Sequence, residues 1–419
     1  MRPALKACVA AVAAMLLASC STLAETKLTR SSADDGPGPD RLLVSTRSGV
    51  EVLDSASKRI VTRAPRSVVS PDSALLFSVS GNGDSTRVVT LDSATGRELA
   101  AAAAPGGLRP TVASADGALL AFAPPHEDGV TPWLPRGKKR TRIAVARTDG
   151  SREPATYSLK GNFELEGFST SGNQLFLLEY MPAMNPTHYE LRRLLLDSGE
   201  VRQISGRKQN APGRMRGTGR IASFSPSGHE LYTLYTQQGP NYAHGSSTHE
   251  SGGSYAFVHL LNLEGGWTHC IDLRAPFGTG RVTTHAMALT PDGDRLFVAD
   301  PTSGGLAVIS PLDTKVLKSV TLDLRALTRG RASATAGQDG TLYLAGGKQI
   351  LEIDGATLEI SARWKIGRKV TGIALGSDGR RLYASLRGKV VVFDAATGAR
   401  TEAFDLSAGK RIIEIVPSL

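Results

Sequence analysis

Residues 285–299 read HAMALTPDGDRLFVA, and this stretch decides the fold. Apolar residues lie on both sides of Pro291-Asp292-Gly293, in which the proline presets φ and the glycine accepts a positive φ. Two apolar runs joined by such a turn predict a β-hairpin. Residues 306–309 and 316–320 predict two further strands, joined by a turn that contains Asp313. The whole unit therefore predicts a four-stranded antiparallel meander.

The same unit recurs along the chain, which is the signature of a repeat architecture. The first residue of the hairpin turn falls at Pro71, Ala115, Thr170, Pro226, Pro291, Gln338, Ser377 and Pro417. The spacings run from 39 to 65 residues, and the longer ones contain loop insertions such as 124–140 and 237–254.

The two ends of the chain complement each other. The last copy stops after its first strand, residues 411–416, whereas residues 41–45, 49–54 and 60–62 supply a second, third and fourth strand. Joining them closes a ring and removes the open sheet edges, as in β-propellers. We therefore expect an all-β fold, a single propeller of eight four-stranded blades over residues 41–419. Seven blades would result if 164–207 or 220–277 were not a blade, and a β-sandwich is the alternative to a propeller.

The repeats resemble the YVTN-type repeats of bacterial propellers, a branch of the WD40-like and quinoprotein-like group. The matching stretches are 291–299 (PDGDRLFVA), 377–385 (SDGRRLYAS), 91–96 (LDSATG) and 393–398 (FDAATG). The resemblance covers nearly all of residues 41–419 and implies a fold, not an activity.

The N-terminus has the pattern of an export signal. Arg2 and Lys6 precede an apolar run, residues 7–18, that is too short to span a bilayer, and Leu17-Ala18-Ser19-Cys20 follows. This four-residue sequence resembles the lipobox of bacterial lipoproteins. The resemblance implies that residues 1–19 are removed and that Cys20 is acylated. The alternative is an ordinary signal peptide with a chance cysteine. We expect residues 20–40 to form a flexible tether with a reach of about 25 Å.

Cysteine and charge content limit the partners. Removal of Cys8 and acylation of Cys20 would leave Cys270 alone, so we expect no intrachain disulfide. The formal net charge is +10, which favours anionic partners. We expect a monomeric domain on the extracytoplasmic side of a bacterial cell membrane, with no nucleic acid partner.

The candidate site is the mouth of the central channel, because the first strand of each propeller blade lines that channel. Candidate ligand-binding residues at the starts of first strands or in the loops before them are Arg109, Glu164, Arg220, Arg281, His285, Arg331 and Arg411. A mouth lined by arginines concentrates anions, and guanidinium groups hold carboxylates or phosphates bidentately. The alternative is that these arginines pair with acids on neighbouring loops.

The sequence predicts no catalytic residue, metal site or cofactor. His244, His249, His259, His269 and Cys270 lie close in sequence, but their spacing matches no zinc-ligand pattern. We therefore expect a binding or scaffolding module whose partner is an acidic envelope polymer, an acidic protein or a small anion. The alternative is an envelope hydrolase or lyase, of the lactonase-like kind that the resemblance implies, with a metal in the channel.

Replacing Cys20 with Ala tests the predicted anchor. We expect the protein to leave the membrane fraction, because acyl chains on Cys20 supply the predicted attachment to the bilayer. Fractionation of cells that produce the parent and the variant measures this. A C20A variant that stays fully membrane-bound would refute lipid anchoring.

Overall fold

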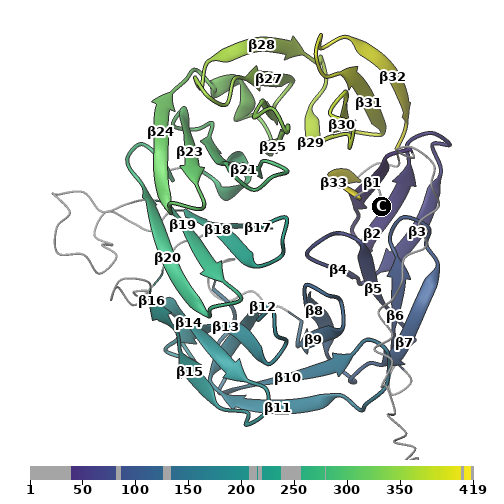
Figure 1. Cartoon of the computed structure of the whole chain (residues 1–419), viewed down its shortest axis with the longest axis vertical. Coiled ribbons are helices and arrows are strands. Elements are labelled where there is room, and N and C mark those ends of the chain that lie inside the picture. Colours follow the sequence, from purple (N-terminus) through teal and green to yellow (C-terminus); the bar gives the residue numbers. More distant parts are fainter. Residues whose placement is uncertain are drawn as a thin grey trace, which may run out of the picture. The chain divides into compact units, whose positions relative to one another are not determined.

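The computed structural model describes residues 39–81, 86–125, 134–206, 215, 219–236, 256–278, 280–406 and 410–416. All of them belong to one compact unit, residues 37–418, which is all-β apart from short 3-10 helices such as η3 (Val282–Thr284) and η4 (Arg325–Leu327). The strands form eight sheets, and these are the eight blades of a β-propeller arranged in a ring (Figure 1). The predicted fold class and blade number are confirmed.

Seven blades are built from consecutive strands. Blade 1 contains β4 (Val68–Val69), β5 (Leu75–Ser80), β6 (Arg87–Asp92) and β7 (Glu98–Ala103). Blade 2 contains β8 (Arg109–Ala113), β9 (Leu119–Ala123), β10 (Arg140–Arg147) and β11 (Ala155–Lys160). Blade 3 contains β12 (Asn162–Phe168), β13 (Gln174–Met181), β14 (His188–Leu195) and β15 (Val201–Gln203). Blade 4 contains β17 (Gly219–Phe224), β18 (Glu230–Thr236), β19 (Ala256–Asn262) and β20 (Trp267–Leu273), with β16 (Ser205–Gly206) added parallel to β20.

The remaining three consecutive blades follow the same order. Blade 5 contains β21 (Ala286–Leu289), β22 (Leu296–Asp300), β23 (Gly305–Ser310) and β24 (Lys315–Thr321). Blade 6 contains β25 (Ser333–Ala336), β26 (Leu342–Gly346), β27 (Gln349–Ile353) and β28 (Ile360–Lys365). Blade 7 contains β29 (Val370–Leu375), β30 (Arg381–Leu386), β31 (Lys389–Asp394) and β32 (Arg400–Asp405).

Blade 8 joins the two ends of the chain. Strand β33 (Arg411–Val416) pairs antiparallel with β1 (Arg41–Ser45), and β2 (Gly49–Asp54) and β3 (Ile60–Pro65) complete the sheet. Figure 1 shows yellow β33 beside purple β1. The split blade closes the ring as predicted. Because residues 164–207 and 220–277 contribute blades 3 and 4, the seven-bladed alternative is excluded.

The core lies between neighbouring blades. Strands β22 and β23 are buried along their whole length, whereas no residue of the rim strand β24 is fully buried. Phe297 of blade 5 belongs to the same apolar cluster as Leu344 and Leu351 of blade 6. Each blade is therefore a layer whose two apolar faces are covered by its neighbours, which explains why the middle strands read as continuous apolar runs.

The repeated turns are held by one hydrogen-bond pattern. In blade 5 the Thr290 hydroxyl donates to Asp292 at 2.5 Å and accepts from the Arg295 N–H at 3.1 Å. Gly293 has φ +80°, a conformation that glycine adopts without strain. In blade 2, Ser114 donates to Asp116 in the same way. The serine or threonine that precedes the turn is thus part of the repeat's chemistry in these blades, whereas Gly337 and Gly376 take that position in blades 6 and 7.

Hydroxyl groups of blades 6 and 7 accept hydrogen bonds from the inner strand of the next blade. An inner strand is the edge of its sheet, so some of its N–H groups have no partner within the blade. The Ile373 N–H donates to the Ser333 hydroxyl at 3.1 Å, and the Ile412 N–H donates to the Ser385 hydroxyl at 3.2 Å. These bonds satisfy backbone donors across the blade boundaries.

Strands β29 and β33 approach so closely that glycine is required between them. A Cβ atom at Gly372 would lie 2.2 Å from the carbonyl oxygen of Ile412, which is backbone and cannot rotate away.

Replacing Gly372 with Ala tests this contact. We expect the free energy of unfolding to fall by about 2–3 kcal/mol, because overpacking forces the two inner strands apart. Urea unfolding of G372A measures the loss. The matched control is G106A, since a Cβ at Gly106 meets no atom within 4 Å. Equal stability of the two variants would contradict the close approach.

Candidate functional site

Every inner strand begins at the same end of the ring. Each blade has four antiparallel strands in succession, so the chain returns to its starting end after each blade. We call this the mouth end, and it carries the connections between blades and between second and third strands. The opposite end, which carries the first-to-second and third-to-fourth turns, is called the turn end.

The predicted ring residues lie at or near the starts of the inner strands. Arg109 opens β8, Arg411 opens β33, and His285 directly precedes β21. Glu164 is the third residue of β12. Arg220 is the second residue of β17, and its side chain lies outside the described part of the structure, as does the whole of Cys20. The predicted register is therefore correct to within two residues.

Basic side chains gather beside Arg411. Arg331, in the connection between β24 and β25, is exposed, and Arg411 is half-buried. Burial and then the positive charge of Arg331 lower the pKa of the Arg411 guanidinium. A Cβ at Gly330 would lie 2.7 Å from the Cε of Lys369, so Lys369 covers the residue next to Arg331. Among the described residues, no carboxylate forms an ion pair with Arg331, Lys369 or Arg411.

Arg109 and Glu164 meet in a pocket between blades 2 and 3. The pocket has a volume of about 210 Å³, and Lys138 adds a second cation to its wall. The Tyr180 hydroxyl donates a hydrogen bond to Glu164. Prolines form much of the remaining wall: Pro110, Pro124, Pro125 and Pro135. These two predicted residues therefore bring both signs of charge into one pocket, unlike the purely basic cluster at Arg331, Lys369 and Arg411.

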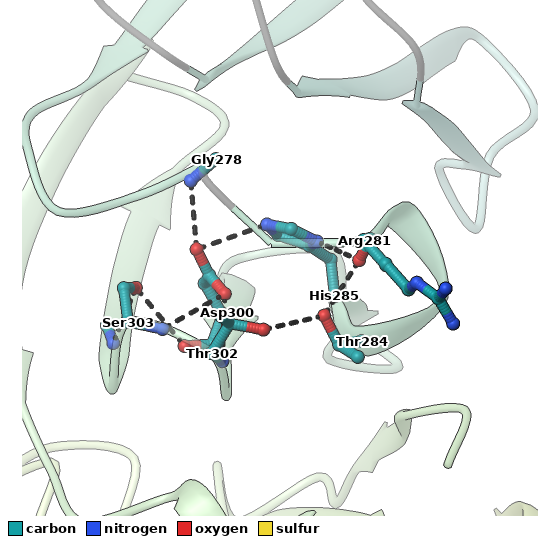
Figure 2. Close-up of polar contacts among 8 residues, drawn as sticks. Gly278, Arg281, Thr284, His285, Asp300, Thr302 and Ser303 are labelled. Atoms are coloured by element: carbon teal, nitrogen blue, oxygen red, sulfur yellow. Dashed lines mark hydrogen bonds and ion pairs between the residues drawn. The ribbon is translucent and has the colours of Figure 1, made fainter. Parts of the chain in front are cut away.

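His285 lies behind the mouth and not on its surface, because its side chain has no exposed area. Its Nδ1 lies 2.9 Å from the carbonyl oxygen of Arg281, and its Nε2 lies 3.2 Å from Oδ2 of Asp300 (Figure 2). The ring is thus held between a backbone carbonyl on one side and the Asp300 carboxylate on the other. His285 therefore holds the Arg281 connection in place while the side chain of Arg281 remains exposed.

Asp300 is the buried partner of His285. Its carboxylate accepts hydrogen bonds from the N–H groups of Gly278 at 2.9 Å and Thr302 at 3.0 Å (Figure 2). Burial alone would raise the pKa of Asp300, but the contact with His285 and the hydrogen bonds from the Gly278 N–H and the Ser303 side chain outweigh it, so the pKa is lowered. Sequence reasoning missed this pair. The hairpin register contained the signal, because Ala286 pairs with Ala299 and the next step outward brings His285 opposite Asp300.

His259 and His269 are the histidines near Cys270 that the structure describes. In the described ranges, no group of three or more His, Cys, Asp or Glu side chains is arranged to hold a metal ion. His259 and Cys270 face each other on β19 and β20, and burial raises the pKa of the Cys270 thiol. A thiol with a raised pKa is a poor nucleophile at neutral pH. His244 and His249 lie outside the described residues.

The sequence matches no protein-family profile and no curated protein. In three dimensions the chain is similar to the dihydro-heme d1 dehydrogenase NirN in complex with DHE, with a TM-score of 0.51 and 19% identity, over 93% of this chain and 78% of NirN. It is also similar to AztD from Citrobacter koseri, with a TM-score of 0.56 and 11% identity, over 90% of this chain and 98% of AztD. At such identities the likeness shows the fold alone.

The described part of the chain contains no helix long and apolar enough to cross a membrane.

Replacing Asp300 with Asn tests the buried pair. We expect the free energy of unfolding at pH 7 to fall by about 3 kcal/mol, because the substitution breaks a buried pair and removes the carboxylate that faces His285 and accepts from the Gly278 N–H. The folded-state pKa of Asp300 is lowered, so its contribution is complete above the unfolded value of about 3.9 and is lost as pH falls through the folded value. Urea unfolding of parent and D300N should therefore differ most at pH 7, and the difference should shrink as the pH falls below about 3.9.

The matched control for D300N is D294N, which changes an exposed turn carboxylate and should cost less than about 0.5 kcal/mol. A D300N variant that is as stable as D294N at pH 7 would show that the His285–Asp300 pair contributes nothing to stability.

Proposed function

We propose that this chain is a lipid-anchored, extracytoplasmic propeller of a bacterial envelope that binds an anionic ligand or partner at its mouth end. The observation that carries the proposal is the basic cluster of Arg331, Lys369 and Arg411. Its two guanidinium groups lie close enough for the charge of one to act on the other, and no described carboxylate pairs with them. Like charges held together repel each other, and an anion bound between them relieves that repulsion.

The chemistry of arginine supports an oxyanion as the ligand. A guanidinium group presents a planar fork of donors that matches carboxylate and phosphate oxygens. Arg411 is fixed at the start of an inner strand and half-buried, whereas Arg331 is exposed. A carboxylate or phosphate entering from solvent would therefore meet Arg331 first and Arg411 deeper in the ring.

The rest of the mouth end has the same sign of charge. The described connections at this end contain fifteen lysines and arginines against one acid, Asp323. The basic residues are Arg47, Arg66, Arg136, Lys138, Lys139, Arg274, Arg281, Arg325, Arg329, Arg331, Lys348, Arg368, Lys369, Arg387 and Lys410. Such a one-sided distribution raises the local concentration of anions and speeds their association.

The anchoring half of the proposal depends on the N-terminal sequence. The predicted anchor is supported by the two basic residues Arg2 and Lys6, by the apolar run after them, and by Leu17-Ala18-Ser19-Cys20. All of these residues lie outside the described part of the structure. The likeness of the repeats to the YVTN-type group is consistent with an envelope protein of bacteria.

Replacing Arg331 and Arg411 together with Ala tests the anion site. We expect polyphosphate to raise the melting temperature of the detergent-solubilised full chain at low salt, and this effect to fade at high salt because the contacts are electrostatic. R331A/R411A should bind polyphosphate at least ten-fold more weakly, since two charge-assisted hydrogen-bonding groups worth about 1.5–3 kcal/mol each are lost. A thermal-shift titration measures both.

The matched control is R295A/R380A, which removes two arginines from the turn end. If that variant and R331A/R411A bind polyphosphate equally well, the mouth cluster is not the site. Divalent metal retained in stoichiometric amount by the purified chain would favour the competing hydrolase or lyase.

A further inference from the structure

The turn end carries the opposite charge from the mouth end. The described turns at this end contain fourteen acids against six lysines and arginines. The acids are Asp72, Asp116, Asp149, Glu153, Asp197, Glu200, Glu264, Asp292, Asp294, Asp313, Asp339, Asp354, Glu359 and Asp378, and the bases are Lys58, Arg59, Arg97, Arg152, Arg295 and Arg380. The propeller is therefore strongly polar along the axis of its ring.

Neighbouring turns at this end are in contact with one another. The side chain of Gln338 in blade 6 donates to Asp292 of blade 5 at 3.4 Å. A Cβ at Gly293 of blade 5 would lie 3.2 Å from the ring of Pro226 in blade 4. The turns of blades 4, 5 and 6 therefore lie against one another at this end.

The chain enters the propeller at the turn end. Asp40, which directly precedes β1, is buried against the first turn of blade 7. Its carboxylate accepts hydrogen bonds from the Ser377 N–H at 3.0 Å, the Ser377 hydroxyl at 2.7 Å and the Tyr383 hydroxyl at 2.7 Å. Its carbonyl accepts from the Ser55 N–H at 3.0 Å. Four hydrogen bonds thus fix the point from which the preceding residues leave the domain.

From these placements we infer that the anchor attaches to the acidic turn end, so that the basic mouth end faces away from the anchoring membrane and takes a polyanionic polymer of the envelope space. The inference rests on the proposed function, both for the acyl anchor and for anion binding. A polymer fits better than a small anion, because the fifteen basic residues are spread over the connections of most blades. One small anion can contact only a few of them at a time.

The distances favour this orientation over one in which the mouth binds lipid headgroups. A strand of six residues such as β2 separates the two ends by about 20 Å. To bring the mouth onto the bilayer, the predicted tether would have to run past the rim and along that height, which would stretch it to about its r.m.s. length of 25 Å or beyond, whereas the opposite orientation needs no such extension. Attraction between the basic mouth and anionic lipids would favour the opposite orientation, but salt screens that attraction beyond a Debye length of about 8 Å.

Two variants, each with one added cysteine in blade 8, report the orientation. Ser48 lies in the exposed mouth-end turn before β2, and Ser57 lies in the exposed turn-end turn after it. Lipidated full-length S48C and S57C are labelled with a donor dye and reconstituted into phosphatidylcholine vesicles with or without 30% phosphatidylglycerol, which carry a headgroup acceptor dye. The unsubstituted chain measures any labelling of Cys270.

We expect energy transfer to be stronger from position 57 than from position 48 in both kinds of vesicle, and bound chains to retain polyphosphate binding. Equal or reversed transfer would overturn the orientation, and reversal confined to phosphatidylglycerol vesicles would assign the mouth to lipid headgroups. Loss of polyphosphate binding with the expected order of transfer would instead refute the proposed anion site. A chain that does not float with the vesicles would refute the anchor.

Discussion

The pairing of β33 with β1 is the contact on which the rest of the structure depends. It joins the last described strand of the chain to the first and completes the sheet of blade 8. Side chains strengthen the same seam: the Ser73 hydroxyl donates to Glu414 of β33 at 2.8 Å, and Asp40 binds blade 7. With the ring closed, each blade has a neighbour on both faces, so every apolar layer is covered.

The ring is closed and each blade has an even number of strands. Together these two features explain why the two ends of the ring carry different residues. Because all inner strands start at one end, each kind of connection repeats at one face. The turn end is acidic partly because its turns use aspartate as a hydrogen-bond acceptor, as Asp116 does for Ser114 and Asp354 does for the Thr357 N–H. No comparable rule of turn chemistry requires arginine at the mouth end. Turn chemistry therefore accounts for part of the acidic turn end but not for the basic mouth end. For this reason the basic residues are the better indicator of a binding role.

The sequence predicted the fold closely, because the fold follows from local signals. Turn residues and apolar periodicity located nearly every strand, including the split blade. The site was harder, because the exposure of a side chain depends on neighbouring blades. His285 was expected at the mouth and is buried against Asp300, while Glu164 bonds to Tyr180 on the adjacent strand. The proximity of Arg331 and Arg411 links two loops about eighty residues apart, which no local pattern encodes.

The rigidity of the inner strands has a consequence for binding. Arg411 begins a strand that pairs with β1 on one side and is bonded through Ser385 to blade 7 on the other. A guanidinium carried by such a strand loses little backbone freedom when it binds a ligand, whereas one on a mobile loop would lose more. The exposed basic residues around it act at longer range and attract anions of many kinds. Selectivity is therefore expected to come from the half-buried position of Arg411, and capture from the charge of the whole face.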